Sequence, residues 1–500
     1  MAGATFSTMP NELVRMIVNW CKNGQDARRL CLVDKKTSPS AQHHLYHCIT
    51  FVPGNFLRLI FLVRTLVENP NLRGLIRHVD FCLGWDARMY PYSMNAPFIL
   101  SDWHNLVFDE SKLSVCESQL LLLCRVNSAT GSRLQSPKVV GSIMGLLLCL
   151  FNSVVQLTLT QLGIDFLEMQ LMGFGQMLVS AIRGGDPVKQ TFCPKLKSLF
   201  LRPSCQHTRI SRYYGKNFQL IQFFLAHPTL EAFTSRYDIG SWDFLDTLGD
   251  GTPLSIKKLM ILRTKTNALT LSKVLRRCPK LTHLYVDVDA GRMESANGHG
   301  QPLEQELGAV ISGSCPGVEE ISLHIPGHGV YKFFGPYADL EISPFLKSLS
   351  NLPDLKVLRI GVALCAFRSE SLPDCASWIP HLLPPQAHSL FLDGTFSQEH
   401  LSKEPYLAGM RSLILNLCGS HQENQLRFNN LVITVHFGSD KVWNDISRDA
   451  RAHGAGTAFR LMIILDPSMF GLLWENSNDI PALMSPQVRR GRVLLDSGLI

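Results

Sequence analysis

The sequence has few charged residues and no long apolar run. Charged side chains make up 18% of its 500 residues, below the roughly 25% of an ordinary soluble domain, so long disordered tails are not expected. The most apolar stretch, residues 143–151, is far shorter than the ~20 residues of a membrane-spanning helix. Met1–Pro10 lacks the basic and apolar regions of a secretory signal. These absences predict a protein that is not secreted and has no membrane partner.

Cysteine pairs and catalytic motifs are also missing. The 14 cysteines are scattered singly, with no C-x-x-C pair, which indicates a reducing compartment (cytoplasm, nucleus or both). The sequence contains no nucleophile elbow, Walker loop, zinc-protease helix or dinucleotide fingerprint. His43, His44, His47 and Cys48 have no second cluster that would complete four zinc ligands, so we interpret them as helix-surface residues. We therefore expect no cofactor, no metal and no catalytic residue.

Positive charge is not concentrated. The net charge of +7 is spread over the whole chain, and the densest basic run, Arg489–Arg492, holds only three charges. A nucleic-acid-binding protein usually gathers Lys and Arg on one face. We therefore expect no nucleic-acid partner, and interpret the run as a solvated tail.

Residues 8–50 have the pattern of a small helical module. Pro10 suits the first turn of a helix, and Glu12 complements its positive end. An apolar stripe at i, i+3, i+4 and i+7 follows, formed by Leu13, Met16, Ile17 and Trp20. Further short helices are expected from about Asp26, and over 38–48. Three such helices bury little surface alone, so they need the rest of the chain or a partner to pack against.

The residues of this module resemble an F-box. The resemblance rests on the segments Met9–Ile17, Leu30–Lys35 and Leu45–Ile49, with Asp34 and Thr37 departing from the family's usual residues. F-boxes dock on the Skp-type adaptor of a cullin–RING (SCF-type) ubiquitin ligase. The resemblance implies a docking surface made by Met9, Pro10, Leu13 and Ile17, with Leu32 and Val33 close to it. The alternative is a helical cap, which repeat arrays also require. A cap must cover the stripe of residues 13–20, whereas a docking module must leave part of it exposed.

Residues 51–437 carry a degenerate repeat, which fits a 500-residue chain better than one ordinary core. The pattern L-x-x-L-x-L, with apolar substitutions, begins at residues 76, 154, 196, 256, 281, 318, 355, 387 and 410, with a last candidate at 428. Several units follow a proline lead-in of the form Cys/Leu-Pro-x-Leu/Val, beginning at Cys193, Cys278, Cys315 and Leu352, with a weaker version at His227. Proline ends a helix, and an extended segment can follow. Insertions are expected near residues 86–140 and 161–190.

This plan of helix, proline turn and short strand predicts an α/β fold. Strands joined through helices should lie parallel in a curved solenoid. The array resembles the leucine-rich-repeat tails that follow an F-box in large fungal families. Residues 438–500 break the repeat, and we interpret them as a C-terminal cap, with a helix over 440–453, a buried strand over 459–465 and a frayed tail after Pro481.

In each strand the leucines should face the core and the intervening residues should face outward. The residues expected on this outer-facing surface are Ser198, Phe200, Arg202, His283, Tyr285, Asp287, Glu320, Ser322, His324, Val357, Arg359, Phe391 and Asp393. Aromatic residues mixed with charges of both signs suit a protein partner. Phe200, Arg202, His283, Tyr285, Asp287, Glu320, His324, Arg359 and Phe391 are the candidate target-binding residues.

Two functions fit this sequence. The first is a non-enzymatic substrate receptor, in which the helices hold the Skp-type adaptor and the solenoid holds a target protein for ubiquitin-dependent degradation. Such a receptor acts by proximity and contributes no chemical group. The second is a stand-alone leucine-rich-repeat interaction scaffold whose N-terminal helices are only a cap.

Overall fold

The computed structural model of the chain describes its secondary structure and turns in separate stretches. These are residues 9–19, 24–33, 37–51, 56–81, 145–160, 193–202, 224–235, 253–264, 268–288, 303–324, 348–361, 386–393, 403–422, 430–434, 440–453, 460–464 and 493–496, with the single residues 35, 111, 113, 118 and 384. The chain forms two compact units, Met1–Thr234 and Ser235–Ile500. The sequence did not predict this boundary. The insertions predicted at 86–140 and 161–190 and the basic run at 489–492 fall outside the described residues, apart from 111, 113 and 118.

The first unit opens with three short helices, as the sequence predicts. They are α1 (Asn11–Asn19), α2 (Gly24–Val33) and α3 (Ser38–His47). Pro39 lies in the first turn of α3, where its missing N–H leaves no bond unmade. Thr37, just before α3, is fully buried and donates a hydrogen bond from Oγ1 to the carbonyl of Leu30 at 2.9 Å. This bond ties the end of α2 to the start of α3.

Short strands follow in the first unit. They are β1 (Cys48–Phe51), β2 (His78–Phe81), β3 (Gln156–Thr160), β4 (Ser198–Arg202) and β5 (Ala232–Ser235), which ends at the unit boundary. Each pairs with the next in chain order, and the pairings from β1 to β4 are parallel. Helices α4 (Phe56–Glu68) and α5 (Pro70–Arg73) connect β1 to β2.

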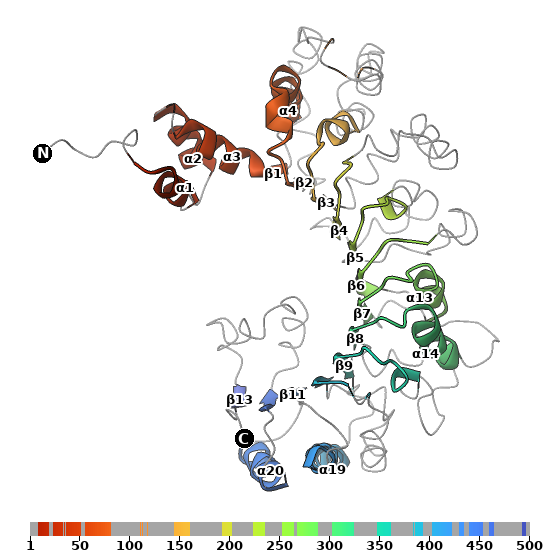
Figure 1. Cartoon of the computed structure of the whole chain (residues 1–500). Coiled ribbons are helices and arrows are strands. Elements are labelled where there is room, and N and C mark those ends of the chain that lie inside the picture. Colours follow the sequence, from red (N-terminus) through yellow and green to blue (C-terminus); the bar gives the residue numbers. More distant parts are fainter. Residues whose placement is uncertain are drawn as a thin grey trace, which may run out of the picture. The chain divides into compact units, whose positions relative to one another are not determined.

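The second unit repeats this plan. Its strands are β6 (Lys258–Thr264), β7 (His283–Val288), β8 (Glu320–His324), β9 (Val357–Gly361), β10 (Ser389–Asp393), β11 (Asn430–Thr434), β12 (Arg460–Ile464) and β13 (Val493–Asp496). They pair in chain order, in parallel up to β12, while β13 is antiparallel to β12. The described helices of this unit are α13 (Ala268–Leu275), α14 (Leu303–Ser314), α19 (Lys403–Gln422) and α20 (Asp440–His453). Figure 1 shows α13 and α14 side by side, both on one side of strands β6–β9.

The proline lead-ins form the turns that the sequence predicts. The N–H of Leu281 donates to the carbonyl of Cys278 at 3.1 Å, and that of Val318 to Cys315 at 3.2 Å. Proline occupies the second position of each turn, where its fixed φ is favourable. Each cysteine is fully buried, and Cys315 Sγ lies 3.4 Å from the carbonyl of Cys278, its counterpart in the preceding repeat. The cysteines are therefore part of the repeat packing.

A second recurring feature joins successive repeats. The carbonyl of Lys257 accepts the N–H groups of Thr282 and His283 at 2.8 and 3.0 Å. The carbonyl of Thr282 accepts those of Glu319 and Glu320 in the same way, at 2.8 and 3.0 Å. One carbonyl before each strand thus sets the register of the next strand, which supports a repeat architecture.

The structure corrects three details of the sequence prediction. The segment Met410–Leu415, predicted as a strand, lies inside helix α19. The buried residues of α19 recur at the three- and four-residue spacing of a helix: Tyr406, Met410, Leu413, Ile414, Leu417 and Cys418. A pattern of only six residues is too short to distinguish this helical spacing from that of a strand. Strand β1 was missed because it directly follows α3, and residues 493–496 form β13, not a frayed tail.

The helix predicted over 440–453 and the strand predicted over 459–465 are confirmed as α20 and β12. Among the helices in the described ranges, none is both long and apolar enough to cross a bilayer.

Candidate functional site

The N-terminal helices have a core of their own. Val14 and Val18 of α1 are almost fully buried against Ala41 of α3. Leu30 and Cys31 of α2 pack against the same cluster. All three helices therefore contribute to one small core, although the sequence stripe at Leu13, Met16, Ile17 and Trp20 did not include its two valines.

Large apolar side chains stay exposed on the same helices. On α1, Leu13 is 46% and Met16 51% exposed, and on α2, Leu32 is 84% and Val33 57% exposed. Helical geometry explains the contrast on α1, because Val14 and Val18 are four residues apart and share one face, while Leu13 and Met16 share another. The outer part of this predicted docking surface is therefore at the molecular surface.

The other predicted docking residues are partly covered. Pro10 is exposed, Ile17 is half-buried, and Met9 is half-buried against the valine cluster. Trp20, the fourth residue of the stripe, lies outside the described residues. Met16 was not among the predicted docking residues, although its spacing of three from Leu13 was visible in the sequence.

The second unit places its predicted target-binding residues in rows. The strand register aligns Tyr285, Ser322, Arg359 and Phe391 in one row across β7–β10. The row before it contains Lys258, His283 and Glu320, and the row after it contains Asp287 and His324, with Asp393 at the same level of β10. The leucines and isoleucines between them, such as Leu284, Ile321 and Leu358, are buried on the opposite face. The alternation is as predicted.

The expected exposure of this face is wrong for most of its residues. Tyr285, Glu320, Ser322, Arg359, Phe391 and Asp393 are all buried, while His283, Asp287, His324 and Val357 are half-buried. Adjacent strands are only ~4.8 Å apart, so long side chains in one row lie against each other. Alternation in the sequence predicts the face of the sheet on which a residue lies. It does not predict whether side chains on neighbouring strands bury that residue.

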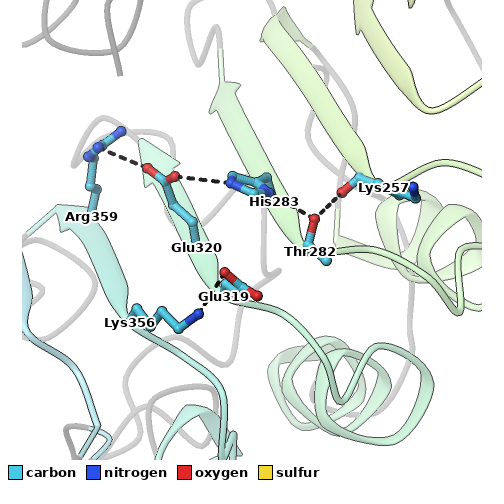
Figure 2. Close-up of polar contacts among 7 residues, drawn as sticks. All are labelled: Lys257, Thr282, His283, Glu319, Glu320, Lys356 and Arg359. Atoms are coloured by element: carbon cyan, nitrogen blue, oxygen red, sulfur yellow. Dashed lines mark hydrogen bonds and ion pairs between the residues drawn. The ribbon is translucent and has the colours of Figure 1, made fainter. Parts of the chain in front are cut away.

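A chain of polar contacts crosses this face, from the row of His283 and Glu320 to Arg359 in the next row, as Figure 2 shows. Arg359 Nη2 lies 2.9 Å from Glu320 Oε1, and Glu320 Oε2 lies 3.8 Å from His283 Nε2. The hydroxyl of Thr282 lies 2.8 Å from His283 Nδ1 and donates to the carbonyl of Lys257 at 3.1 Å. The Glu319–Lys356 pair, 2.9 Å apart, does not join this chain of contacts.

Burial lowers the pKa values of two basic side chains on this face, His283 and Lys258. Burial lowers the pKa of His283, partly opposed by the Glu320 carboxylate, so His283 is neutral at pH 7. Burial also lowers the pKa of Lys258, against the attraction of Glu320. Lys258 Nζ lies 5.2 Å from the centre of the Tyr285 ring, and the Arg359 guanidinium lies 4.6 Å from that of Phe391. Two cations therefore contact aromatic faces here. Lys258 was missed in the sequence, although it aligns in register with His283.

His324 is held between two carboxylates. Its Nδ1 lies 2.7 Å from Asp287 Oδ1, and its Nε2 lies 2.9 Å from Asp393 Oδ2. Burial alone would lower the pKa of His324, but the hydrogen bonds and charges of the two aspartates outweigh it and raise the pKa to about 10. Both ring nitrogens therefore donate, and His324 is positively charged at pH 7.

Other predicted residues fall in the first unit. Phe200 of β4 is half-buried, and the side chain of Arg202 lies outside the described side chains. His43 and His47 stack with ring centres 5.5 Å apart, and His47 lies 5.1 Å from His78 of β2. In the described part of the chain, no group of three His, Cys, Asp or Glu side chains could hold a metal ion.

No protein-family model and no curated protein sequence matches this chain.

Proposed function

We propose that this protein is the substrate-recognition subunit of a cullin–RING ubiquitin ligase of the SCF type. Helices α1–α3 form an F-box-like module that binds a Skp-type adaptor, and the repeats form a leucine-rich-repeat-like solenoid that binds a target protein. One observation carries the proposal: Leu13, Met16, Leu32 and Val33 are exposed on helices that already have a core of their own.

The exposure favours docking over capping. A cap would turn its apolar stripe onto the first repeat, yet Leu13 and Met16 are each about half exposed. Exposed apolar side chains of this size, gathered on one small module, mark interaction surfaces. Leu13, Leu32 and Val33 are also residues at which the sequence resembles the F-box docking surface.

The proposed receptor contributes no chemical group. It raises the local concentration of target lysines near a conjugating enzyme, so its effect on rate comes from proximity. The target-binding part is assigned to the rows of polar and aromatic residues on strands β6–β10, where His283, Asp287 and His324 are only half-buried.

Adaptor binding is the direct test. The full chain is incubated with a purified Skp-type adaptor, beside a Leu13→Ser/Leu32→Ser double variant. Loss of two exposed apolar contacts should weaken binding at least ten-fold, because each buried leucine contributes about 1.5–3 kcal/mol to an interface. Phe61→Ser is the matched control, since Phe61 is 52% exposed but lies on α4.

Binding by the wild type and the Phe61 variant, with loss in the double variant, supports the receptor. If the folded wild-type chain does not bind the adaptor, the receptor proposal is wrong and a stand-alone interaction scaffold replaces it.

A further inference from the structure

The row formed by Tyr285, Ser322, Arg359 and Phe391 contains a buried arginine, some of whose N–H groups donate no hydrogen bond within the described part of the chain. Arg359 is 5% exposed, and its register neighbour Ser322 is fully buried. Glu320 is the ion-pair partner of Arg359, 2.9 Å from Nη2. Arg359 Nε and Nη1 and the Ser322 hydroxyl are buried and, within the described part of the chain, have no hydrogen-bond partner. Glu320 Oε1 forms the ion pair with Arg359 Nη2, but within the described part of the chain it accepts no hydrogen bond.

Such a group is unusual inside a protein. A guanidinium stays charged at any physiological pH and carries five N–H donors. Leaving buried donors unsatisfied is costly, so native structures pair nearly all of them. Two donors on one buried Arg, beside an unpaired buried hydroxyl, therefore indicate a position that another acceptor fills.

The local charge also has an excess of one positive unit. Lys258 and Arg359 are cations, and among the described residues Glu320 is the carboxylate that acts on both of them, while His283 is neutral at pH 7. The second acidic group on this face, Asp287 with Asp393, is already occupied by protonated His324. One further negative charge would balance the Lys258–Arg359–Glu320 cluster.

The position is bordered by aromatic rings and lies beside a partly exposed row. The Arg359 guanidinium lies 4.6 Å from the Phe391 ring centre and 6.0 Å from that of Tyr285. These rings fix its plane and exclude water, which strengthens a charged hydrogen bond. In the adjacent row, Lys258 is half-buried and the His283 side chain is 35% exposed, so an anion can approach from that side.

We propose that the second unit has an anion-binding site at Arg359 and Ser322, and that its ligand presents a carboxylate or a phosphate group. The oxygens of that group accept hydrogen bonds from Arg359 Nε–H and Nη1–H and from the Ser322 hydroxyl, and Lys258 supplies the second positive charge. Guanidinium groups suit carboxylate and phosphate oxygens because their donors are planar and always charged. The site does not depend on adaptor binding by the first unit.

Calorimetric titration of the full chain tests this site. Inorganic phosphate and acetate are titrated separately at pH 7 and constant ionic strength, with sodium chloride as the reference anion. We expect one-site binding of at least one of the two anions, and the one that binds more tightly identifies the ligand group. Calorimetry is chosen because phosphate also stabilises proteins by exclusion from their surface, without binding.

Three variants locate the binding. Arg359→Met should abolish it, and Ser322→Ala should weaken it about five-fold through the loss of one hydrogen bond. Ser322→Ala removes only a hydroxyl that has no partner among the described residues, so it keeps the test valid if Arg359→Met fails to fold. Lys356→Met is the control, because exposed Lys356 pairs with Glu319 away from the site and its loss should leave the affinity unchanged.

Two results would overturn the proposal. One is that neither anion binds the folded wild-type chain more tightly than chloride. The other is that Ser322→Ala and Arg359→Met bind as tightly as the wild type.

Discussion

His324 Nε2 and Asp393 Oδ2 lie 2.9 Å apart although their strands, β8 and β10, are not neighbours. Strand β9 runs between them, and alternate strands of a sheet are about 9.6 Å apart. The β9 residue at this level is Gly361, which is in register with Asp393. With no side chain there, His324 reaches across β9, and the ion pair ties three consecutive repeats together.

Removing the buried partner of this pair should destabilise the second unit. Asp393 is fully buried, and its loss would remove one of the two carboxylates that hold the His324 cation. We expect Asp393→Ala to lower the free energy of unfolding by about 3 kcal/mol, measured by urea denaturation. Exposed Asp354 provides the control, and Asp354→Ala should change stability by less than about 0.5 kcal/mol. Equal effects of the two substitutions would contradict a structural role for the pair.

The pKa of His324 predicts a loss of stability in alkali. Its folded-state pKa of about 10 lies above the ordinary value of ~6.5, so the folded protein holds a proton that the unfolded chain releases. The stabilisation is complete below pH ~6.5 and is lost as the pH rises through 10, with a slope of up to about 1.4 kcal/mol per pH unit. His324→Gln should flatten the curve of unfolding free energy between pH 7 and 10. The idea fails if wild type and variant have parallel curves.

His47 predicts the opposite dependence in acid. Burial first, and then the charges of His78, His43, Arg77 and His44, lower the pKa of His47. The folded protein therefore keeps His47 neutral where the unfolded chain would take up a proton. Its contribution is complete above pH ~6.5 and is lost as the pH falls below that value. His47→Gln should make the first unit less sensitive to acid, measured by thermal unfolding from pH 7 to pH 5. A wild-type curve no steeper than that of the variant would exclude this effect.

The buried cysteines should resist thiol reagents. Burial raises the pKa of Cys315 to about 12, and the reactive form of a cysteine is its thiolate. Cys48 of β1, by contrast, is exposed. Brief labelling of the native protein with iodoacetamide, followed by peptide mass spectrometry, should modify Cys48 and leave Cys193, Cys278, Cys315 and Cys418 unmodified until the chain unfolds. Labelling of Cys315 at the rate of Cys48 would show that the repeat turns are open.

Core and surface positions of the N-terminal helices should respond differently to substitution. Val18 is 2% exposed, whereas Leu32 is 84% exposed. Val18→Ala should cost about 1–3 kcal/mol because it leaves a gap between the helices. Leu32→Ser should change the free energy of unfolding by less than about 0.5 kcal/mol. Circular dichroism during thermal unfolding measures both, and a large loss for Leu32→Ser would place that residue in a core.

The sequence by itself determined the local elements of this protein. Proline lead-ins before Leu281, Val318 and Leu355 predicted turns followed by short strands, because proline cannot continue a helix beyond its first turn. Apolar alternation predicted which residues of each strand face the core. The three N-terminal helices and α20 also followed from local spacing. Where the pattern was too short, at Met410–Leu415, the same reasoning assigned a strand to a helix.

Only the tertiary structure decided which side chains meet. Arg359, Glu320 and His283 lie on three different strands, and His324 and Asp393 are 69 positions apart in the sequence yet form an ion pair. Strand register and the missing side chain of Gly361 set these contacts, and neither can be deduced from the residues of one repeat. The burial of Arg359 likewise depends on Tyr285 and Phe391 beside it. Local sequence fixes the direction of a side chain from its own backbone, whereas contact, burial and pKa depend on neighbours that the fold brings from distant repeats.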